Sequence, residues 1–211
     1  MADWVAISSL ATAGGTFALA ATTYASVRSA NRAARSAERS LLAELRPLLI
    51  QSSPDDSSQR IAFIDSVGVT ASGGAVGVEV VDGRAYIVPS LRNVGPGIAV
   101  LEGGFVSPLR RNGNLDHTPL DQYRMLTRDI YIPPGKLGFW QVAFREEDAG
   151  REEILAAVDR GEFAFEVLYG DYEGGQRVIT RFNVIRDEDG VWRHSVVRHW
   201  RLGTSREASA S

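Results

Sequence analysis

The sequence contains no cysteine, only three histidines and a single lysine among its 211 residues. Without cysteine the chain can form no disulfide, no thiolate metal site and no cysteine nucleophile. The histidines do not supply a metal motif either. His117 lies in a polar loop, and His194 and His199 are five residues apart on one expected strand, so that they point to opposite faces. The sequence therefore predicts no metal ion and no other cofactor.

The motifs that mark nucleotide-binding and hydrolytic sites are also missing. There is no G-x-x-x-x-G-K-S/T, no G-x-G-x-x-G and no G-x-S-x-G. Asp171 and Glu173 flank a Gly-Gly turn, and the acidic run 187–189 lacks the ligand pattern of a calcium loop. We interpret both as solvated turns. An enzyme with an unrecognised site remains an alternative.

Charge is unevenly distributed around a net value of −3. Residues 1–46 carry +2, residues 47–190 carry −8 and residues 191–211 carry +3. An acidic body disfavours nucleic-acid binding, because contacts with phosphates require clustered cations. We therefore expect no nucleic-acid partner.

Residues 4–27 contain no charged side chain. As a helix they would be ~36 Å long, which is enough to cross a hydrocarbon core of ~30 Å. Trp4 and Tyr24 lie near the two ends, where aromatic side chains favour the membrane interfaces. These features predict that residues 1–27 form a transmembrane anchor.

Two other interpretations of this stretch stay open. Residues 18–20 imitate the cleavage site of a signal peptide, although the first three residues lack the positive charge usual in such signals. Alternatively, because two thirds of the stretch is alanine, serine, threonine and glycine, it is a helix buried in a soluble fold. Small residues at every fourth position from 14 to 34 would also allow close helix packing and self-association.

A basic stripe follows the uncharged stretch. One face of an expected helix over residues 28–46 carries Arg28, Arg32, Arg35, Arg39 and Arg46, and the opposite face is apolar. We expect these arginines to lie along an anionic lipid bilayer, or alternatively to be solvated on a stalk that packs through its apolar face. The positive-inside rule then predicts a single-pass protein of the cell membrane, with its amino terminus outside and its following domain in the cytoplasm.

Short apolar runs alternate with turn residues after Pro47, which ends the expected helix. This pattern predicts a mainly β protein: an antiparallel immunoglobulin-like β-sandwich over residues 47–203 with one short helix, followed by a disordered tail over 204–211. Asp82-Gly83 predicts a type I′ turn between strands 78–81 and 84–91. Further strands are expected at 61–67, 137–144 and 191–202, a glycine-rich loop or hairpin at 68–77, and a helix over 146–160.

Two motifs in this domain resemble a known family. Residues 90–99, Ser-Leu-Arg-Asn-Val-Gly-Pro-Gly-Ile-Ala, and residues 132–135, Ile-Pro-Pro-Gly, are similar to the N-x-G-x-x-A and I-P-P-G pair of bacterial immunoglobulin-like domains of the CARDB type. The resemblance covers residues 84–145, and the layout resembles single-pass bacterial membrane proteins that end in such a domain. It implies adhesion or scaffolding and brings no catalytic residues. In physical terms, we expect Asn93 and the glycines after it to shape a corner between two strands.

The last expected strand carries the candidate partner-binding residues Trp192, Arg198, Trp200 and Arg201, because tryptophan and arginine are favoured at interface hot spots. Regular alternation would place one set of residues on a single face, namely Trp192, His194, Val196, Arg198, Trp200 and Leu202. The alternative is an edge strand whose tryptophans enter the core and whose arginines prevent edge-to-edge pairing.

Together these features predict a membrane-anchored, non-enzymatic interaction or scaffold protein. Its cytoplasmic sandwich would hold a protein partner or another copy of the same chain. A soluble or exported ligand-binding domain is the main alternative.

Overall fold

The structure is a computed structural model that describes residues 3–111 and 116–202, and in the first helix the side chains of residues 14–38 and 40–44. The predicted tail 204–211 and the side chains of Trp4 and Arg39 lie outside the described residues. The chain divides into two compact units, residues 1–43 and residues 44–211. Each unit is described separately below.

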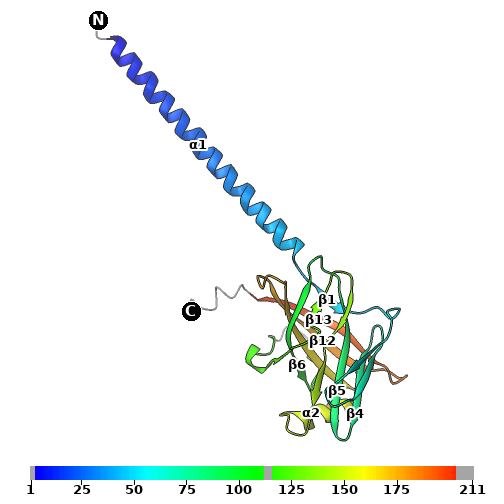
Figure 1. The fold of residues 1–211 in the computed structure, drawn as a ribbon. Coiled ribbons are helices and arrows are strands. Elements are labelled where there is room, and N and C mark those ends of the chain that lie inside the picture. Colours follow the sequence, from blue (N-terminus) through cyan, green and yellow to red (C-terminus); the bar gives the residue numbers. More distant parts are fainter. Residues whose placement is uncertain (1–2, 112–115, 203–211) are drawn as a thin grey trace. The chain divides into compact units, whose positions relative to one another are not determined.

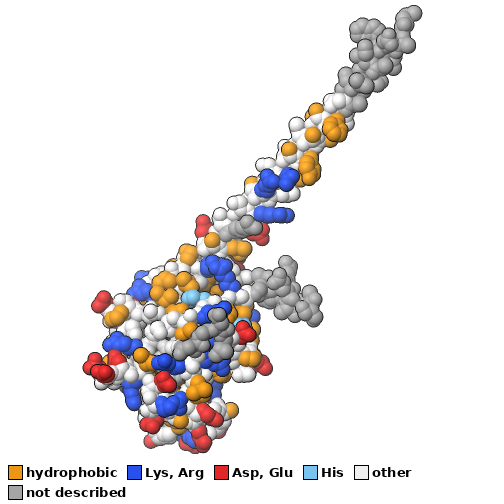
Figure 2. All heavy atoms as spheres, turned by 180° about the vertical axis from the view of Figure 1, so that it is seen from behind, with side chains coloured by type: hydrophobic (Ala, Val, Ile, Leu, Met, Phe, Trp, Pro, Cys, Tyr) orange, Lys and Arg blue, Asp and Glu red, His pale blue; other side chains and the backbone are white. Residues whose placement is uncertain are grey.

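The first unit is a single helix, α1 (Asp3–Glu44). It runs without interruption through the predicted boundary between residues 27 and 28, as its high content of alanine favours. Every described side chain of the helix is exposed, and Figure 2 shows hydrophobic side chains and then arginines on its surface. The helix ends two residues before the predicted end, so Arg46 lies outside it.

In the described part of the chain, no helix combines the length and the apolar composition that crossing a membrane requires.

The second unit is mainly β (Figure 1), and all strand pairs among its described residues are antiparallel. The strands are β1 (Leu49–Gln51), β2 (Gln59–Ala62), β3 (Gly68–Ala71), β4 (Val76–Val81), β5 (Arg84–Asn93), β6 (Ala99–Ser107), β7 (Arg124–Met125), β8 (Tyr131–Ile132), β9 (Leu137–Phe139), β10 (Val142–Phe144), β11 (Glu162–Gly170), β12 (Arg177–Arg186) and β13 (Trp192–Leu202). The helical elements of this unit are η1 (Leu120–Gln122), a 3₁₀ turn, and α2 (Arg151–Arg160).

The strands of this unit form two sheets and a hairpin. In the first sheet β5 is central, with β4 and β1 along one edge and β10 and β9 along the other. The second sheet has the order β13-β12-β11-β6, with β7 and β8 paired to the outer edge of β6. Strands β2 and β3 form a separate hairpin.

The main hydrophobic core draws on both sheets and on α2, so the two sheets enclose it. Phe165 lies at its centre: its ring stacks 4.6 Å from Phe182 and 5.7 Å from Trp140. Two smaller clusters cover the outer faces. One joins the β2–β3 hairpin to Tyr86 and Val88 of β5. The other lies on the outer face of the second sheet, and we call it the outer cluster: Tyr123, Leu168 and Ile179, with Phe105, Trp200 and Leu202 packed against them.

The connection from β5 to β6 carries the chain from the first sheet to the second, and Asn93 holds it. This side chain is completely buried. Its Oδ1 accepts hydrogen bonds from the N–H groups of Leu48 (3.1 Å) and Gly95 (3.0 Å). Its Nδ2 donates to the carbonyls of Gly97 (2.7 Å) and Ile132 (2.9 Å). Every hydrogen-bonding position of the amide is therefore used.

The two sequence motifs meet at this corner. Besides the bond from Asn93 to Ile132, the N–H of Gly135 donates to the Asn93 carbonyl (2.8 Å). Gly95 and Gly97 are required because a Cβ on either would overlap the carbonyl oxygen of Arg46 or Leu45. The prediction of a corner shaped by Asn93 and its glycines is confirmed.

The predicted hairpin at residues 82–83 is also confirmed, since Asp82 (φ 50°) and Gly83 (φ 70°) both have the positive φ of a type I′ turn. The single predicted strand 137–144 is divided instead into β9 and β10. The pairing register of β5 continues across the gap, so that Pro89 lies opposite Trp140. Proline has no N–H to donate, and the ladder is therefore interrupted there.

Three further boundaries differ from the sequence-based expectation. The strand predicted over 61–67 ends at Ala62, because a tight turn follows in which Ser66 has a positive φ (65°). The loop or hairpin predicted over 68–77 contains strand β3 and the first two residues of β4. The helix predicted from residue 146 begins at Arg151, because Asp148 caps a turn by accepting the N–H of Arg145 (2.6 Å) and Gly150 is left-handed (φ 79°).

Replacing Asn93 by aspartate tests the corner. The variant Asn93→Asp keeps the shape of the side chain but turns its donor group into an acceptor that faces the carbonyls of Gly97 and Ile132. We expect the free energy of unfolding to fall by about 3 kcal/mol or more, measured by urea denaturation with tryptophan fluorescence. The exposed change Asn31→Asp is the control and should cost less than about 0.5 kcal/mol. Equal losses in the two variants would contradict this role.

Candidate functional site

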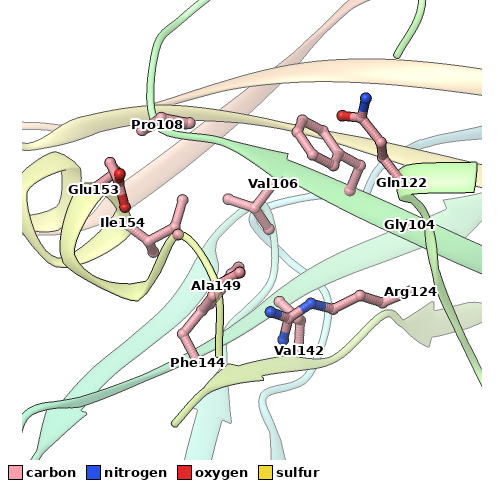
Figure 3. Close-up of a pocket in the computed structure, with 12 residues that line it drawn as sticks. Gly104, Val106, Pro108, Gln122, Arg124, Val142, Phe144, Ala149, Glu153 and Ile154 are labelled. Atoms are coloured by element: carbon pink, nitrogen blue, oxygen red, sulfur yellow. The ribbon is translucent and has the colours of Figure 1, made fainter. Parts of the chain in front are cut away.

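A cavity lies between the two sheets at the start of α2 (Figure 3), and we call it the pocket. Its volume is about 420 Å³, within the range of small-molecule sites. Its walls come from β6, the segment with η1 and β7, strand β10, and the turn that leads into α2. Most of the side chains that line it are apolar: Phe105, Val106, Pro108, Val142, Phe144 and Ile154.

Three polar side chains line the pocket, namely Gln122, Arg124 and Glu153. Figure 3 shows Glu153 and Ile154 on one side of the cavity and Gln122 and Arg124 on the other. The guanidinium of Arg124 lies 4.4 Å from the centre of the Phe144 ring. It donates to the carbonyl of Ala143 (2.8 Å) and forms an ion pair with Asp148 (3.1 Å).

A buried ion pair lies on the outer face of the second sheet. Arg181 of β12 is completely buried, and its Nε donates to the Glu166 carboxylate of β11 (2.7 Å). The carboxylate also accepts the Thr118 N–H (2.9 Å) and the hydroxyl of Tyr123, and Arg181 donates to the carbonyl of Asp116 (2.6 Å). These charge-assisted hydrogen bonds join strands β11 and β12 to the segment that covers them, residues 116–123.

These contacts set the charge states of the cluster. Burial by itself would raise the pKa of Glu166, but the hydrogen bonds from Tyr123, Thr118 and Arg181 outweigh it and hold that pKa below its usual value. Burial and the neighbouring carboxylate raise the pKa of Tyr123 far above its usual value. The phenol therefore stays protonated and donates to an ionised Glu166.

The ion pair and the pocket share a structural element. The segment that donates Thr118 and Tyr123 to Glu166 continues directly into Arg124, and Gln122 precedes Tyr123. One wall of the pocket is therefore held in place by the buried ion pair. Gly104, which pairs with Arg124 in the ladder between β6 and β7, is required because a Cβ there would meet the Trp140 ring at 2.5 Å.

A β-bulge alters the faces of the last strand. Arg181 pairs with Arg198 and Phe182 with Val196, which leaves Val197 without a partner across the ladder. Trp192 and His194 therefore face the core, whereas Trp200, beyond the bulge, lies in the outer cluster. The prediction that Trp192 and Trp200 share one face is wrong, because one inserted residue reverses the alternation.

The candidate partner-binding residues are consequently separated. Trp192 is a core residue whose ring lies 5.5 Å from that of Phe163. Trp200 is half-buried, with the guanidinium groups of Arg181 and Arg198 at 4.6 and 5.4 Å from its ring. Arg201 is exposed. Arg198, Trp200 and Arg201 remain on or near the surface, and the alternative that tryptophan enters the core holds for Trp192.

The three histidines lie in separate environments. His117 is half-buried, with its ring edge-on to Trp200 at 5.9 Å. His199 Nδ1 lies 2.7 Å from the hydroxyl of Thr180. His194 is buried beside Phe165 and Phe182, and among the described residues neither ring nitrogen has a hydrogen-bond partner. Nowhere in the described ranges do three metal-binding side chains come together.

The candidate membrane-surface arginines lie in two different units. Arg28, Arg32 and Arg35 are exposed on α1 and share a shallow hollow with Tyr24. Arg46 is half-buried in the second unit, where its carbonyl accepts the Gly97 N–H (3.3 Å). The Arg39 side chain lies outside the described residues.

The pocket was not predicted from the sequence. Its lining comes from segments 104–108, 122–124 and 142–154, which only the pairing of strands brings together. No local motif marks them. Glu153 showed only the ordinary pattern of an acidic residue in the first turn of a helix.

Comparison of the chain with protein-family models, with curated proteins and with solved structures found no match.

The buried ion pair predicts a large and non-additive cost of mutation. Glu166→Gln should lower the free energy of unfolding by roughly 3–5 kcal/mol, because Arg181 would remain charged and buried without its partner. The double variant Glu166→Gln with Arg181→Met should lose less than the sum of the two single variants. Urea denaturation of the four proteins measures the coupling.

A matched pair on the same sheet provides the control. Glu102 and Arg177 are also bonded (2.6 Å), but about a quarter of each side chain is exposed. Glu102→Gln should cost at most about 1 kcal/mol. If Glu102→Gln costs as much as Glu166→Gln, burial is not the reason that the pair of Glu166 and Arg181 stabilises the domain.

His194 predicts acid sensitivity. Burial lowers the pKa of His194 to about 4, below the value near 6.5 of an unfolded chain. Above pH 6.5 the ring is neutral in both states. Between pH 6.5 and 4 only the unfolded chain takes up the proton, so stability should fall by roughly 3 kcal/mol across this window.

The variant His194→Leu removes this titrating group and puts an apolar side chain of similar size in its place. Its free energy of unfolding, measured by urea denaturation at several pH values, should decline less than that of the wild type from pH 6.5 to 4. Parallel declines would show that other groups dominate the acid sensitivity.

Proposed function

We propose that this protein is a membrane-anchored, non-enzymatic recognition protein. In this proposal α1 attaches the chain to the cell membrane, and the β domain, arranged as an immunoglobulin-like sandwich of the CARDB type, holds a partner on the cytoplasmic side.

The observation that carries the proposal is the exposure of α1. Its large apolar side chains Phe17, Leu19 and Tyr24 are each 69–79 % exposed. The described residues of the main hydrophobic core all belong to the second unit. Helices draw most of their stability from packing of an apolar face, so the apolar side chains along α1 call for a covering environment. An apolar bilayer supplies one.

The charges of α1 support the same arrangement. Tyr24, Arg28, Arg32 and Arg35 lie along one face at helical spacing. Aromatic side chains favour the headgroup region, and each arginine near an anionic leaflet is worth about 1 kcal/mol. The uncharged stretch would then lie in lipid and the basic stripe at its cytoplasmic surface.

A soluble or exported ligand-binding domain is the second candidate. Two observations favour it: the lack, within the described residues, of a helix apolar enough to span a membrane, and the pocket with its mainly apolar lining. Both candidates assign recognition to the β domain. They differ in what covers α1.

Membrane fractionation with a reporter fused to the carboxyl end tests the anchor. After a carbonate wash the protein should remain in the membrane pellet, and the reporter should be active on the cytoplasmic side. The triple variant Arg28→Gln, Arg32→Gln and Arg35→Gln should lose this fixed orientation, because the positive charges set it.

The control changes three exposed arginines of the β domain, Arg60, Arg110 and Arg128, to glutamine. This variant carries the same change in net charge and should keep the wild-type orientation. Release of the wild-type protein by carbonate would overturn the anchor and leave the soluble ligand-binding domain.

A further inference from the structure

We propose that the pocket binds a ligand with an apolar body and a single cationic group, paired with the carboxylate of Glu153. This inference rests on the proposed recognition function, for which it names a site and a ligand chemistry. Such a cation occurs on a free organic amine and on a lysine side chain of a protein partner.

The body of the ligand follows from the lining. Val106, Val142, Phe144 and Ile154 are buried core residues whose surfaces border the cavity, and Phe105 adds an aromatic wall. Burial of apolar ligand surface against such walls is the main source of affinity in sites of this kind. A cavity of about 420 Å³ accommodates a phenylalkyl or branched aliphatic group.

Arg124 does not set the charge of the ligand. Its guanidinium is already neutralised by Asp148 (3.1 Å), donates to the Ala143 carbonyl (2.8 Å) and packs over the Phe144 ring (4.4 Å). An anionic ligand would have to compete with Asp148, whose carboxylate is also held by the Arg145 N–H (2.6 Å). The cation on this side of the pocket is therefore part of the wall.

Glu153 is the charge that remains without a partner. It projects from the first turn of α2 on the side of the cavity opposite Arg124 (Figure 3). Among the described residues no cationic group lies within ion-pair distance of its carboxylate. Counting Arg124, Asp148 and Glu153 together, the pocket has one uncompensated negative charge.

Long-range electrostatics favour the same sign. The unit that holds the pocket, residues 44–211, carries a net charge of −5, and a cleft of one charge on such a body attracts ligands of the opposite charge. An ammonium group paired with the exposed carboxylate of Glu153 forms a charge-assisted hydrogen bond, which is stronger than a hydrogen bond between neutral groups.

The test uses the full chain in nanodiscs of phosphatidylcholine, a lipid without net charge, with empty nanodiscs as reference. Isothermal titration calorimetry compares three probes with the same apolar body: 4-phenylbutylamine, 4-phenylbutanol and 4-phenylbutyrate. We expect saturable binding of the amine, and binding of the carboxylate that is at least about tenfold weaker.

Two substitutions of neighbouring carboxylates separate the role of Glu153 from general charge. Glu153→Gln should weaken amine binding by about tenfold or more and leave binding of the alcohol unchanged. Glu152→Gln is the matched control, because Glu152 is on the same helix but is not part of the pocket lining. Thermal unfolding confirms that both variants fold.

A third variant, Ala149→Trp, places a large side chain in the lining of the cavity and should abolish binding of amine and alcohol alike.

A fourth probe, a peptide, identifies the source of the cation. Tighter binding of acetyl-Leu-Lys-Leu-amide than of 4-phenylbutylamine indicates a protein partner, and weaker binding indicates a small amine.

The inference is overturned if 4-phenylbutyrate binds as tightly as the amine, if Glu152→Gln has the same effect as Glu153→Gln, or if no probe binds saturably. Carboxylate binding that Ala149→Trp abolishes would refute the cationic ligand while leaving recognition at the pocket intact. The membrane anchor is tested separately by fractionation and does not depend on either outcome.

Discussion

The buried amide of Asn93 is the contact on which the arrangement of the two sheets depends. It lies at the end of β5, where the chain leaves the first sheet for β6 in the second. Its four hydrogen bonds reach the start of the domain at Leu48, the crossover itself at Gly95 and Gly97, and strand β8 at Ile132. A buried amide with every donor and acceptor engaged has few alternative geometries, because each displacement leaves an unsatisfied polar group. One side chain thus fixes three passes of the backbone.

Local sequence patterns were sufficient where the structure depends on local chemistry. The positive φ of Asp82 and Gly83, and the corner at Asn93, follow from residue type alone, and the strands expected at 84–91 and 191–202 end within two residues of β5 and β13. The errors at residues 137–144 and in β13 arise where a partner strand intervenes. Pro89 interrupts a strand that is distant in sequence, and the bulge at Val197 reverses the faces of β13 only because β12 pairs with it as it does. Neither effect is visible in the affected segment itself.

The candidate site could not be predicted for the same reason, because its residues come together only through the pairing of strands that are distant in sequence. Arginines and tryptophans were chosen as candidates by type, yet Trp192 stabilises the core and Arg46 belongs to the second unit. The pocket instead uses residues without any motif, brought together by the pairing of β6 with β7 and of β5 with β10. The buried pair of Glu166 and Arg181 was equally hidden, because an alternating strand pattern assigns both residues to a solvated face. The segment that covers them is what removes them from water.

That covering segment links the stability of the domain to the geometry of the pocket. Because Glu166 holds Tyr123, the residues on either side of Tyr123 are fixed, and Gln122 and Arg124 form a rigid wall of the pocket. Arg124 in turn ties β7 to β10 and, through Asp148, to the turn that positions α2. Its charge is consumed by these structural contacts. Glu153 lies on α2, the element at the end of this series of contacts, but its side chain takes no part in them. A charge that contributes nothing to holding the wall together is free to act on a ligand, and for this reason Glu153 rather than Arg124 determines the sign of the group that the pocket accepts.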